Sequence, residues 1–144
     1  MANQEIETRP PMTGERRPIS VLLVDDHRFV GNVLGRLLAT EPDIALHCCY
    51  SAVDAIALAN HINPTVILQD LILPDIDGLA LVRMFRANEQ TATTPVIVLS
   101  GNDDADSRDR ARVEGANDYL VKLPPKDALI ACIRRHAFGL ESAQ

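Results

Sequence analysis

Short apolar runs alternate along the chain with longer stretches in which apolar residues recur every three or four positions. Each run has four to seven residues, which suits a buried strand and is too short for an isolated helix. The runs lie at residues 19–24, 44–50, 65–70, 95–99 and 118–121. Strands that alternate with helices predict a parallel sheet covered on both faces. We therefore expect an α/β fold with five strands and five helices.

The helices are expected after each strand, and two of them have distinctive sequences. The second begins after Ser51, whose hydroxyl is expected to cap it. Its predicted inner face consists of Val53, Ile56, Ala57 and Asn60. The fourth, residues 103–114, is mostly charged, and its apolar stripe consists of Ala105, Ala111 and Val113. Because this stripe buries little apolar surface, we expect the fourth helix to be the most loosely held.

Composition and charge restrict the class of protein. The chain has 144 residues, of which 47% are hydrophobic and 3% aromatic, so one domain must pack its core from aliphatic side chains. A net charge of -6 and the lack of a basic cluster argue against nucleic acid or a membrane as partner. No apolar run approaches the roughly 20 residues that span a bilayer. The N-terminus has no signal-peptide pattern, so we expect a cytoplasmic protein.

The expected domain covers residues 18–138, between a flexible N-terminal tail at 1–17 and a C-terminal tail at 139–144. All three cysteines lie within apolar patterns, which favours reduced, buried thiols over redox or metal-binding roles. They are Cys48, Cys49 and Cys132. The four histidines show no pairing at metal-ligand spacing.

Polar residues stand where four of the predicted strands end. Asp25 and Asp26 follow the first strand, Asp70 ends the third, and Ser100 and Lys122 end the last two. Because βαβ connections are almost always right-handed, these strand ends meet at one edge of the sheet. Ligands bind at that edge in open α/β sheets. Each residue alone also fits a turn, a helix cap or a solvated strand end, so the prediction depends on the four ends together.

The expected cluster of carboxylates predicts a metal site. Adjacent carboxylates repel by something like 4 kcal/mol per pair at an effective dielectric constant near 20. Protonation of one carboxyl group or a divalent cation relieves that repulsion, and oxygen ligands suit Mg²⁺. A carboxylate can also attack phosphorus. Mg²⁺, Lys122, and the Ser100 hydroxyl with the Gly101 N–H would then neutralise the phosphoryl oxygens. The sequence therefore predicts a phosphoryl-aspartate site at Asp70.

Four motifs have the order and spacing of a known family. They are Val-Leu-Leu-Val-Asp-Asp (21–26), Asp-Leu-Ile-Leu-Pro-Asp-Ile-Asp-Gly (70–78), Pro-Val-Ile-Val-Leu-Ser-Gly (95–101) and Gly-Ala-Asn-Asp-Tyr-Leu-Val-Lys (115–122). From about residue 19 to residue 138, the chain resembles the receiver domain of two-component response regulators. That resemblance implies a flavodoxin-like, doubly wound parallel sheet with strand order 2-1-3-4-5.

The resemblance also implies the role of each site residue. Asp70 would be the phosphoacceptor, Ser100 the hydroxyl that moves toward the phosphoryl group, and Lys122 the paired cation. Tyr119 would be the aromatic switch, which turns inward when Ser100 moves. The implied Mg²⁺ ligands are Asp26, Asp70, the backbone carbonyl of Ile72 and, through water, Asp25. The domain would be a signalling phosphoacceptor that promotes its own phosphorylation and dephosphorylation, rather than an enzyme.

The implied partners are a sensor histidine kinase or a phosphotransfer protein, either of which would donate from its own phosphohistidine. The mixed charges around the fourth helix leave two hypotheses open: a homodimer through the fourth helix, fifth strand and fifth helix, or a solvated helix face. Residues 64–71 and 117–124 further resemble the receivers of Wsp-type regulators, which carry a diguanylate cyclase domain. This chain ends at Gln144, so we expect its output to come from a partner protein or from a domain that has been removed.

Two positions depart from the usual receiver pattern. Leu123 stands between Lys122 and Pro124, where most receivers have proline directly after the lysine. Ile72, two residues after the acceptor, offers an attacking water no hydrogen bond, so we expect slow self-dephosphorylation. An Asp-nucleophile phosphohydrolase of the haloacid-dehalogenase type is an alternative, but it would place a second carboxylate at Ile72. A degenerate receiver that binds partners without phosphorylation is the other alternative.

Overall fold

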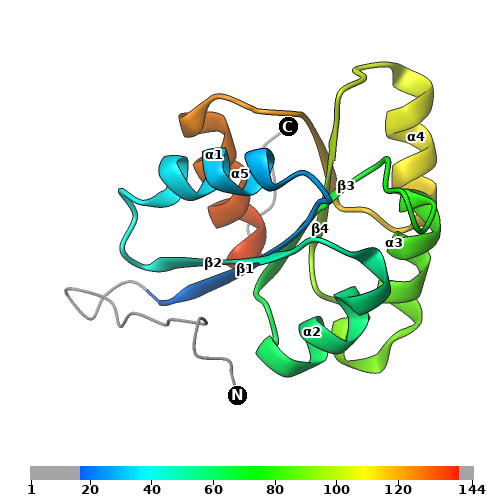
Figure 1. The fold of residues 1–144 in the computed structure, drawn as a ribbon, viewed down its shortest axis with the longest axis horizontal. Helices are drawn as coiled ribbons and strands as arrows, with labels where there is room; N and C mark the ends of the chain where they lie inside the picture. The colour runs from blue at the N-terminus through cyan, green and yellow to red at the C-terminus, as the bar shows by residue number, and fades with distance from the viewer. Residues whose placement is uncertain (1–16, 140–144) are drawn as a thin grey trace.

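A five-stranded parallel sheet runs through the middle of the computed structural model, which describes residues 17–139 (Figure 1). The strands are β1 (Ile19–Val24), β2 (Ile44–Cys49), β3 (Val66–Asp70), β4 (Val96–Ser100) and β5 (Asp118–Val121). Their order is β2-β1-β3-β4-β5, and every neighbouring pair is parallel. This confirms the expected doubly wound α/β fold.

Within residues 17–139, five α-helices cover the two faces of the sheet (Figure 1). They are α1 (Arg28–Leu38), α2 (Ala55–Ile62), α3 (Gly78–Ala87), α4 (Ala105–Glu114) and α5 (Lys126–Ala137). Helices α1 and α5 pack on one face, and α2, α3 and α4 pack on the other. Because successive side chains of a strand point to opposite faces, one strand contributes to both apolar clusters. In β3, for example, Ile67 packs toward α2 and α3, whereas Val66 and Leu68 pack toward α1 and α5.

The register of the sheet brings the polar strand ends together. Asp70 of β3 lies opposite Leu99 of β4, one residue before Ser100. Ser100 in turn lies opposite Val121 of β5, one residue before Lys122. Since all five strands run the same way, these residues share the carboxyl edge of the sheet.

Gly78 fixes the close approach of α3 to the loop that follows β3. A Cβ atom at this position would overlap the backbone carbonyl of Leu71, so only glycine fits without movement of the chain. Ile72 and Asp77 form an isolated bridge across the same loop. The loop after Asp70 is therefore folded tightly back on itself.

The start of α2 differs from the prediction. A 3₁₀ turn (Ala52–Asp54) precedes the helix, and the Ser51 side chain makes no capping hydrogen bond. The Ser51 hydroxyl donates instead to Asp75 Oδ2 at 3.1 Å. The tighter turn rotates the buried face, so two residues of the predicted inner face are exposed: Val53, at 68%, and Ala57. The buried residues of this segment are Ala52, Ala55 and Ala59.

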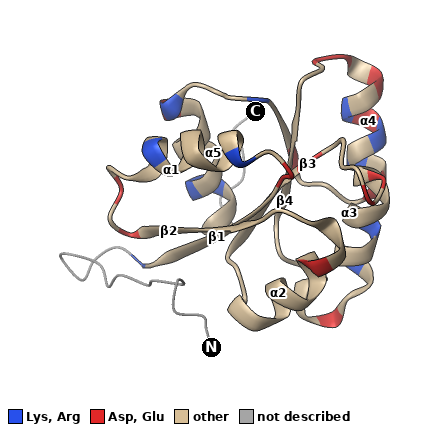
Figure 2. Ribbon diagram, viewed as in Figure 1, with Lys and Arg blue, Asp and Glu red and all other residues tan. Residues whose placement is uncertain are grey.

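Helix α4 has the weak apolar face that its sequence predicts. Only Ala111 is buried, while Val113 is 81% exposed. Basic and acidic residues are spread along its ribbon (Figure 2). Two pairs within the helix, Arg110 with Asp106 and Arg112 with Asp109, and a third between Arg108 and Asp103 just before it, are exposed ion pairs, which stabilise little. That α4 is the most loosely held helix stays a prediction.

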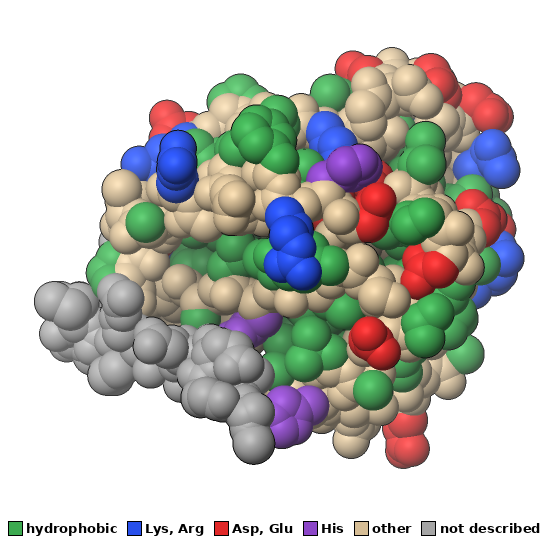
Figure 3. Space-filling model, in the orientation of Figure 1, with side chains coloured by type: hydrophobic (Ala, Val, Ile, Leu, Met, Phe, Trp, Pro, Cys, Tyr) green, Lys and Arg blue, Asp and Glu red, His purple; other side chains and the backbone are tan. Residues whose placement is uncertain are grey.

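The cysteines, the surface charge and the helix lengths agree with the composition of the chain. The three cysteines are free, with Cys49 and Cys132 buried and Cys48 partly so. The face in Figure 3 shows acidic, basic and apolar side chains interspersed, with no large patch of one charge on its described part. Among residues 17–139, no helix is long and apolar enough to cross a membrane. The expected tails, 1–17 and 139–144, lie outside the described residues except for their innermost residue.

Candidate functional site

Three aspartates meet at the carboxyl edge of the sheet. Asp25 and Asp26 lie just beyond β1, and Asp70 is the last residue of β3. Ligand atoms of these residues and of His27 lie within 4.8 Å of one another. Asp25 and Asp70 are buried, and the side chain of Asp26 is partly exposed. The site is therefore a small acidic group with one side open to solvent.

Lys122 joins two of the carboxylates. Its ammonium Nζ lies 3.0 Å from Asp70 Oδ2 and 3.1 Å from Asp25 Oδ2. Its backbone N–H donates to the Ser100 carbonyl at 2.7 Å, which extends the β4–β5 ladder to the site. The Lys122–Leu123 bond is trans, and Leu123 adopts φ 55°. That left-handed conformation costs on the order of 1–2 kcal/mol for a non-glycine residue. Leu123 thus lets the chain turn away directly after Lys122.

The protonation of the central groups reflects burial and pairing. Burial raises the pKa of Asp70, and its hydrogen bonds with Lys122 and the Ile72 N–H only partly offset this effect. Burial opposes the charged form of Lys122, but its hydrogen bonds to Asp70 and Asp25 raise its pKa overall. One cation is therefore shared among several carboxylates and does not neutralise them all.

The residues of this group fit a divalent cation. Asp26 Oδ1 is buried and accepts no hydrogen bond, although the His27 ring nitrogen Nδ1 lies 3.4 Å from it. Buried carboxylate oxygens are rarely left without a partner. Carboxylate oxygens around one open position suit Mg²⁺, which keeps several of its waters. The Ile72 N–H donates to Asp70 Oδ1 at 3.1 Å, so the backbone of Ile72, the residue expected to supply a carbonyl ligand, contacts Asp70.

Ser100 and Gly101 end β4 beside the acidic group. Ser100 is buried, and its Oγ accepts the Asn102 N–H at 3.0 Å. A Cβ atom at Gly101 would meet nothing within 4 Å, so this backbone is open. The register brings both residues to the correct edge, and the Ser100 hydroxyl is held by the turn that follows it.

Tyr119 points inward in this structure. Its side chain is buried, and its hydroxyl donates to the Asn102 carbonyl at 2.7 Å. The Arg108 guanidinium lies over the ring, 4.8 Å from its centre. Asn102 therefore connects the two expected switch residues, because its N–H bonds to Ser100 and its carbonyl bonds to Tyr119.

Sequence reasoning gave no role to His27, Asn102 or Arg108. His27 follows the two aspartates directly, and its backbone N–H donates to Asp25 Oδ1 at 2.9 Å. That adjacency was the available signal for His27. Asn102 and Arg108 act through a backbone carbonyl and a ring contact, which no sequence motif reveals.

Comparisons with known proteins agree on one family. A sequence model described as the response regulator receiver domain matches residues 21–134. The chain is 34% identical over 118 residues to the transcriptional regulatory protein TrcR of Mycobacterium tuberculosis, covering 81% of this chain and 44% of TrcR. It is 26% identical over 118 residues to protein PilG of Pseudomonas aeruginosa, covering 82% and 87%. The chain thus spans less than half of TrcR and most of PilG.

Solved structures show the same likeness. A response regulator from Desulfuromonas acetoxidans matches with a TM-score of 0.77 at 28% identity, covering 85% of this chain and 99% of that one. The receiver domain of the Francisella response regulator 1452 matches with a TM-score of 0.76 at 27% identity, with the same coverage of both chains.

Proposed function

Because this chain belongs to the family of response regulator receiver domains, we propose that Asp70 is the residue that carries its signal, as an aspartyl phosphate. The observation that carries this proposal is the contact of Lys122 Nζ with the buried carboxylates of Asp70 and Asp25, beside the unpartnered oxygen of Asp26. A carboxylate next to one shared cation and an open metal position suits phosphoryl transfer, which depends on placement and charge neutralisation.

In the proposed reaction, an Asp70 oxygen attacks the phosphorus atom of a phosphohistidine on a sensor kinase or phosphotransfer protein. The new O–P bond forms as the N–P bond breaks, and the imidazole leaves with the electron pair. Asp25, Asp26, Asp70 and the Ile72 carbonyl would hold Mg²⁺, which supplies positive charge to the phosphoryl oxygens. Lys122 would move from the carboxylates to a phosphoryl oxygen, and Ser100 with the Gly101 N–H would bind another. The same groups would catalyse the later hydrolysis.

We propose that the phosphoryl group switches the molecule through Asn102. Ser100 is held by the Asn102 N–H, and Tyr119 is bonded to the Asn102 carbonyl. Movement of Ser100 toward the phosphoryl group would break the first bond and favour a second packing of Tyr119 and α4. The result would be a population shift between two packings, expressed on the surface of α4, β5 and α5. That surface is the proposed site of homodimerisation or partner binding.

The finer identity is also a proposal. The segments 64–71 and 117–124 resemble Wsp-type receivers, so a partner that makes or senses a cyclic dinucleotide is one candidate for the output. Cytoplasmic location agrees with the family and is part of the same proposal. The family match does not favour the alternatives of a phosphohydrolase or a degenerate receiver.

Intact mass spectrometry after incubation with acetyl phosphate and Mg²⁺ tests the proposal directly. Wild type is expected to gain the mass of one phosphoryl group, and Asp70→Asn is expected to gain none. Asp75→Asn is the matched control, because Asp75 lies in the same loop but is exposed. A phosphoryl group on Asp70→Asn, or its loss in Asp75→Asn alone, would contradict the assignment of Asp70.

A further inference from the structure

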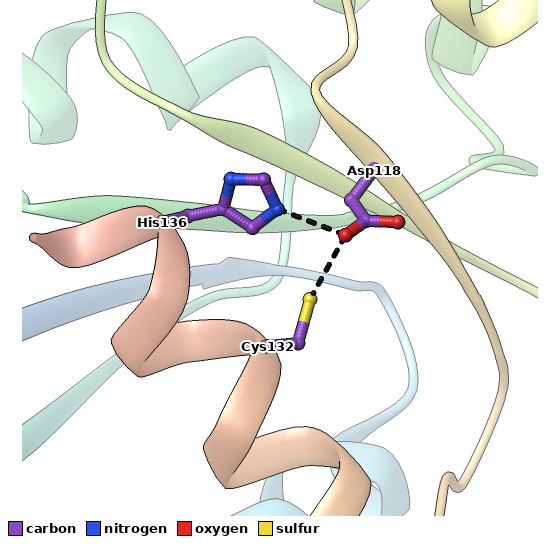
Figure 4. A group of neighbouring side chains, drawn as sticks. All are labelled: Asp118, Cys132 and His136. Carbon is purple, nitrogen blue, oxygen red and sulfur yellow. Dashed lines mark hydrogen bonds and ion pairs between the residues drawn. The ribbon is translucent and has the colours of Figure 1, made fainter. Parts of the chain in front are cut away.

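A second group of metal-ligating side chains lies at the other end of β5, away from Lys122. Asp118 is the first residue of β5, while Cys132 and His136 belong to α5. Cys132 and His136 are four residues apart, so they project from the same side of the helix. Figure 4 shows both side chains directed at the Asp118 carboxylate. The three ligand atoms lie within 4.8 Å of one another.

The contacts of Asp118 hold its carboxylate in place. Its Oδ2 lies 2.8 Å from His136 Nε2 and 3.4 Å from Cys132 Sγ, and it accepts from the Arg135 guanidinium at 3.0 Å. Its Oδ1 accepts the Tyr119 N–H at 2.9 Å. Oδ2 is therefore the point at which the cysteine and the histidine converge.

We propose that Asp118 Oδ2, Cys132 Sγ and His136 Nε2 bind a transition metal ion of the Zn²⁺ type, with water as the fourth ligand. Carboxylate, thiolate and imidazole are the three side-chain ligand classes of Zn²⁺, and three protein ligands with one open position is a recurrent arrangement. With bond lengths near 2.1 Å to N and O and 2.3 Å to S, tetrahedral ligands lie roughly 3.4–3.6 Å apart. Cys132 Sγ is about 0.2 Å closer to Asp118 Oδ2 than a tetrahedral site requires, and His136 Nε2 is about 0.6 Å closer, so both side chains have only to move back slightly.

The ligand set predicts which metal binds where. Thiolate and imidazole select Zn²⁺ and its neighbours, whereas Mg²⁺ prefers oxygen ligands and water. The cluster at the carboxyl edge offers chiefly carboxylate oxygens, and the one at Asp118 offers oxygen, nitrogen and sulfur. The carboxyl-edge site would therefore prefer Mg²⁺ and the Asp118 site a softer metal such as Zn²⁺. Excess Mg²⁺ would occupy the first site and leave the Asp118 site free.

Binding requires two changes in the cluster. Burial, with the nearby charge of Asp118, raises the pKa of Cys132 to about 12, so the thiol keeps its proton when no metal is present. On metal binding the S–H bond breaks, a metal–sulfur bond forms and the proton passes to solvent. Arg135 must also leave Asp118, and since its side chain is 34% exposed it can turn into water. The Asp118 and His136 side chains are partly exposed, so an ion can reach them.

The same contacts also have a purely structural interpretation, in which Arg135 and His136 pair with Asp118 to tie α5 to β5. The spacing of the histidines in the sequence does not reveal this cluster, because the residue four positions before His136 is a cysteine, Cys132. The structural interpretation predicts no metal–thiolate bond, and a spectroscopic probe of that bond separates the two.

The test is a titration with Co²⁺ in excess Mg²⁺, read by ultraviolet and visible absorption. A thiolate bound to Co²⁺ gives a charge-transfer band that carboxylate and imidazole ligands do not give. Wild type is expected to show this band and to saturate at one equivalent, and Zn²⁺ is expected to displace the Co²⁺. Cys132→Ser should abolish the band, and His136→Gln should weaken binding roughly tenfold or more.

Cys48→Ser and His61→Gln are the matched controls, because both residues lie outside the cluster, and neither should change the titration. Circular dichroism establishes that each variant is folded. Absence of a charge-transfer band in folded wild type would overturn the proposal. So would a band that persists in Cys132→Ser or disappears in Cys48→Ser. These results do not depend on phosphorylation, so this proposal and the proposed function can fail separately.

Discussion

Asp70→Asn is expected to stabilise the protein when no divalent metal is bound. The Asp70 carboxylate lies 3.0 Å from Lys122 Nζ, an attraction of about 5.5 kcal/mol at an effective dielectric constant of 20. Oxygen atoms of Asp25 and Asp26 lie within 4.8 Å, so each repels Asp70 by about 3.5 kcal/mol or more. The two repulsions exceed the attraction by about 1.5 kcal/mol. Removal of the Asp70 charge should therefore raise the free energy of unfolding by about 1–2 kcal/mol.

The measurement is urea unfolding with a metal chelator present, followed by circular dichroism. Asp127→Asn, an exposed position on α5, is the control and should stay within about 0.5 kcal/mol of wild type. With saturating Mg²⁺, wild type should become more stable than Asp70→Asn. A ligand at a hundred times its Kd adds roughly 2.7 kcal/mol to the free energy of unfolding of a folded state that binds it. An Asp70→Asn variant less stable than wild type in chelator would refute the electrostatic reasoning.

The pH dependence gives an independent check. Burial raises the pKa of Asp70 in the folded protein, so the folded state holds this proton more tightly than the unfolded chain does. The contribution of Asp70 to wild-type stability should therefore fall as pH rises from the ordinary aspartate pKa, about 3.9, through the raised folded value. Asp70→Asn lacks this loss, so its advantage should be small near pH 4 and complete at neutral pH. If the stability of Asp70→Asn relative to wild type decreased with rising pH, Asp70 would not have a raised pKa in the folded protein.

Three further predictions concern other parts of the molecule. Lys122→Met leaves the buried Asp25 and Asp70 without their cation, and should destabilise the chelated protein by roughly 3–5 kcal/mol in urea unfolding. The exposed, apolar Ile72 side chain offers water no hydrogen bond, so the phosphorylated protein should lose its label slowly; a half-life of seconds, measured by intact mass, would contradict this. Burial raises the pKa of all three cysteine thiols, but Cys48 alone is only partly buried, so it should react first with a thiol reagent at pH 8, while Cys49 and Cys132 react on unfolding; equal rates for all three in the native state would refute this order.

The sheet and its polar edge could be predicted because each strand is a short apolar run, and four of the five runs are followed by or end in a polar residue. Asp70, Ser100 and Lys122 follow that rule, and the register brings them to one edge. The start of α2 could not be predicted in the same way. The Ser51 hydroxyl donates to Asp75 and does not cap the helix, and the 3₁₀ turn directs Val53 outward.

The other contacts that could not be predicted from the sequence depend on how the folded chain brings segments together. Asn102 links Ser100 to Tyr119 through its backbone, and backbone groups leave no trace in a sequence. Asp118 meets Cys132 only because α5 folds back along β5. Helical spacing shows the Cys132–His136 pair, but the third ligand comes from the fold. Sequence patterns thus predict elements and their ends better than they predict which side chains meet.

Lys122 and Asp70 are 52 residues apart along the chain, and they meet only when β5 has joined the sheet. During synthesis, Asp70 leaves the ribosome well before the cation that completes its surroundings. If Asp70 is the acceptor, as proposed, a nascent chain that stops short of β5 holds it without the cation of Lys122. The proposed site is then complete only after the last strand has joined the sheet.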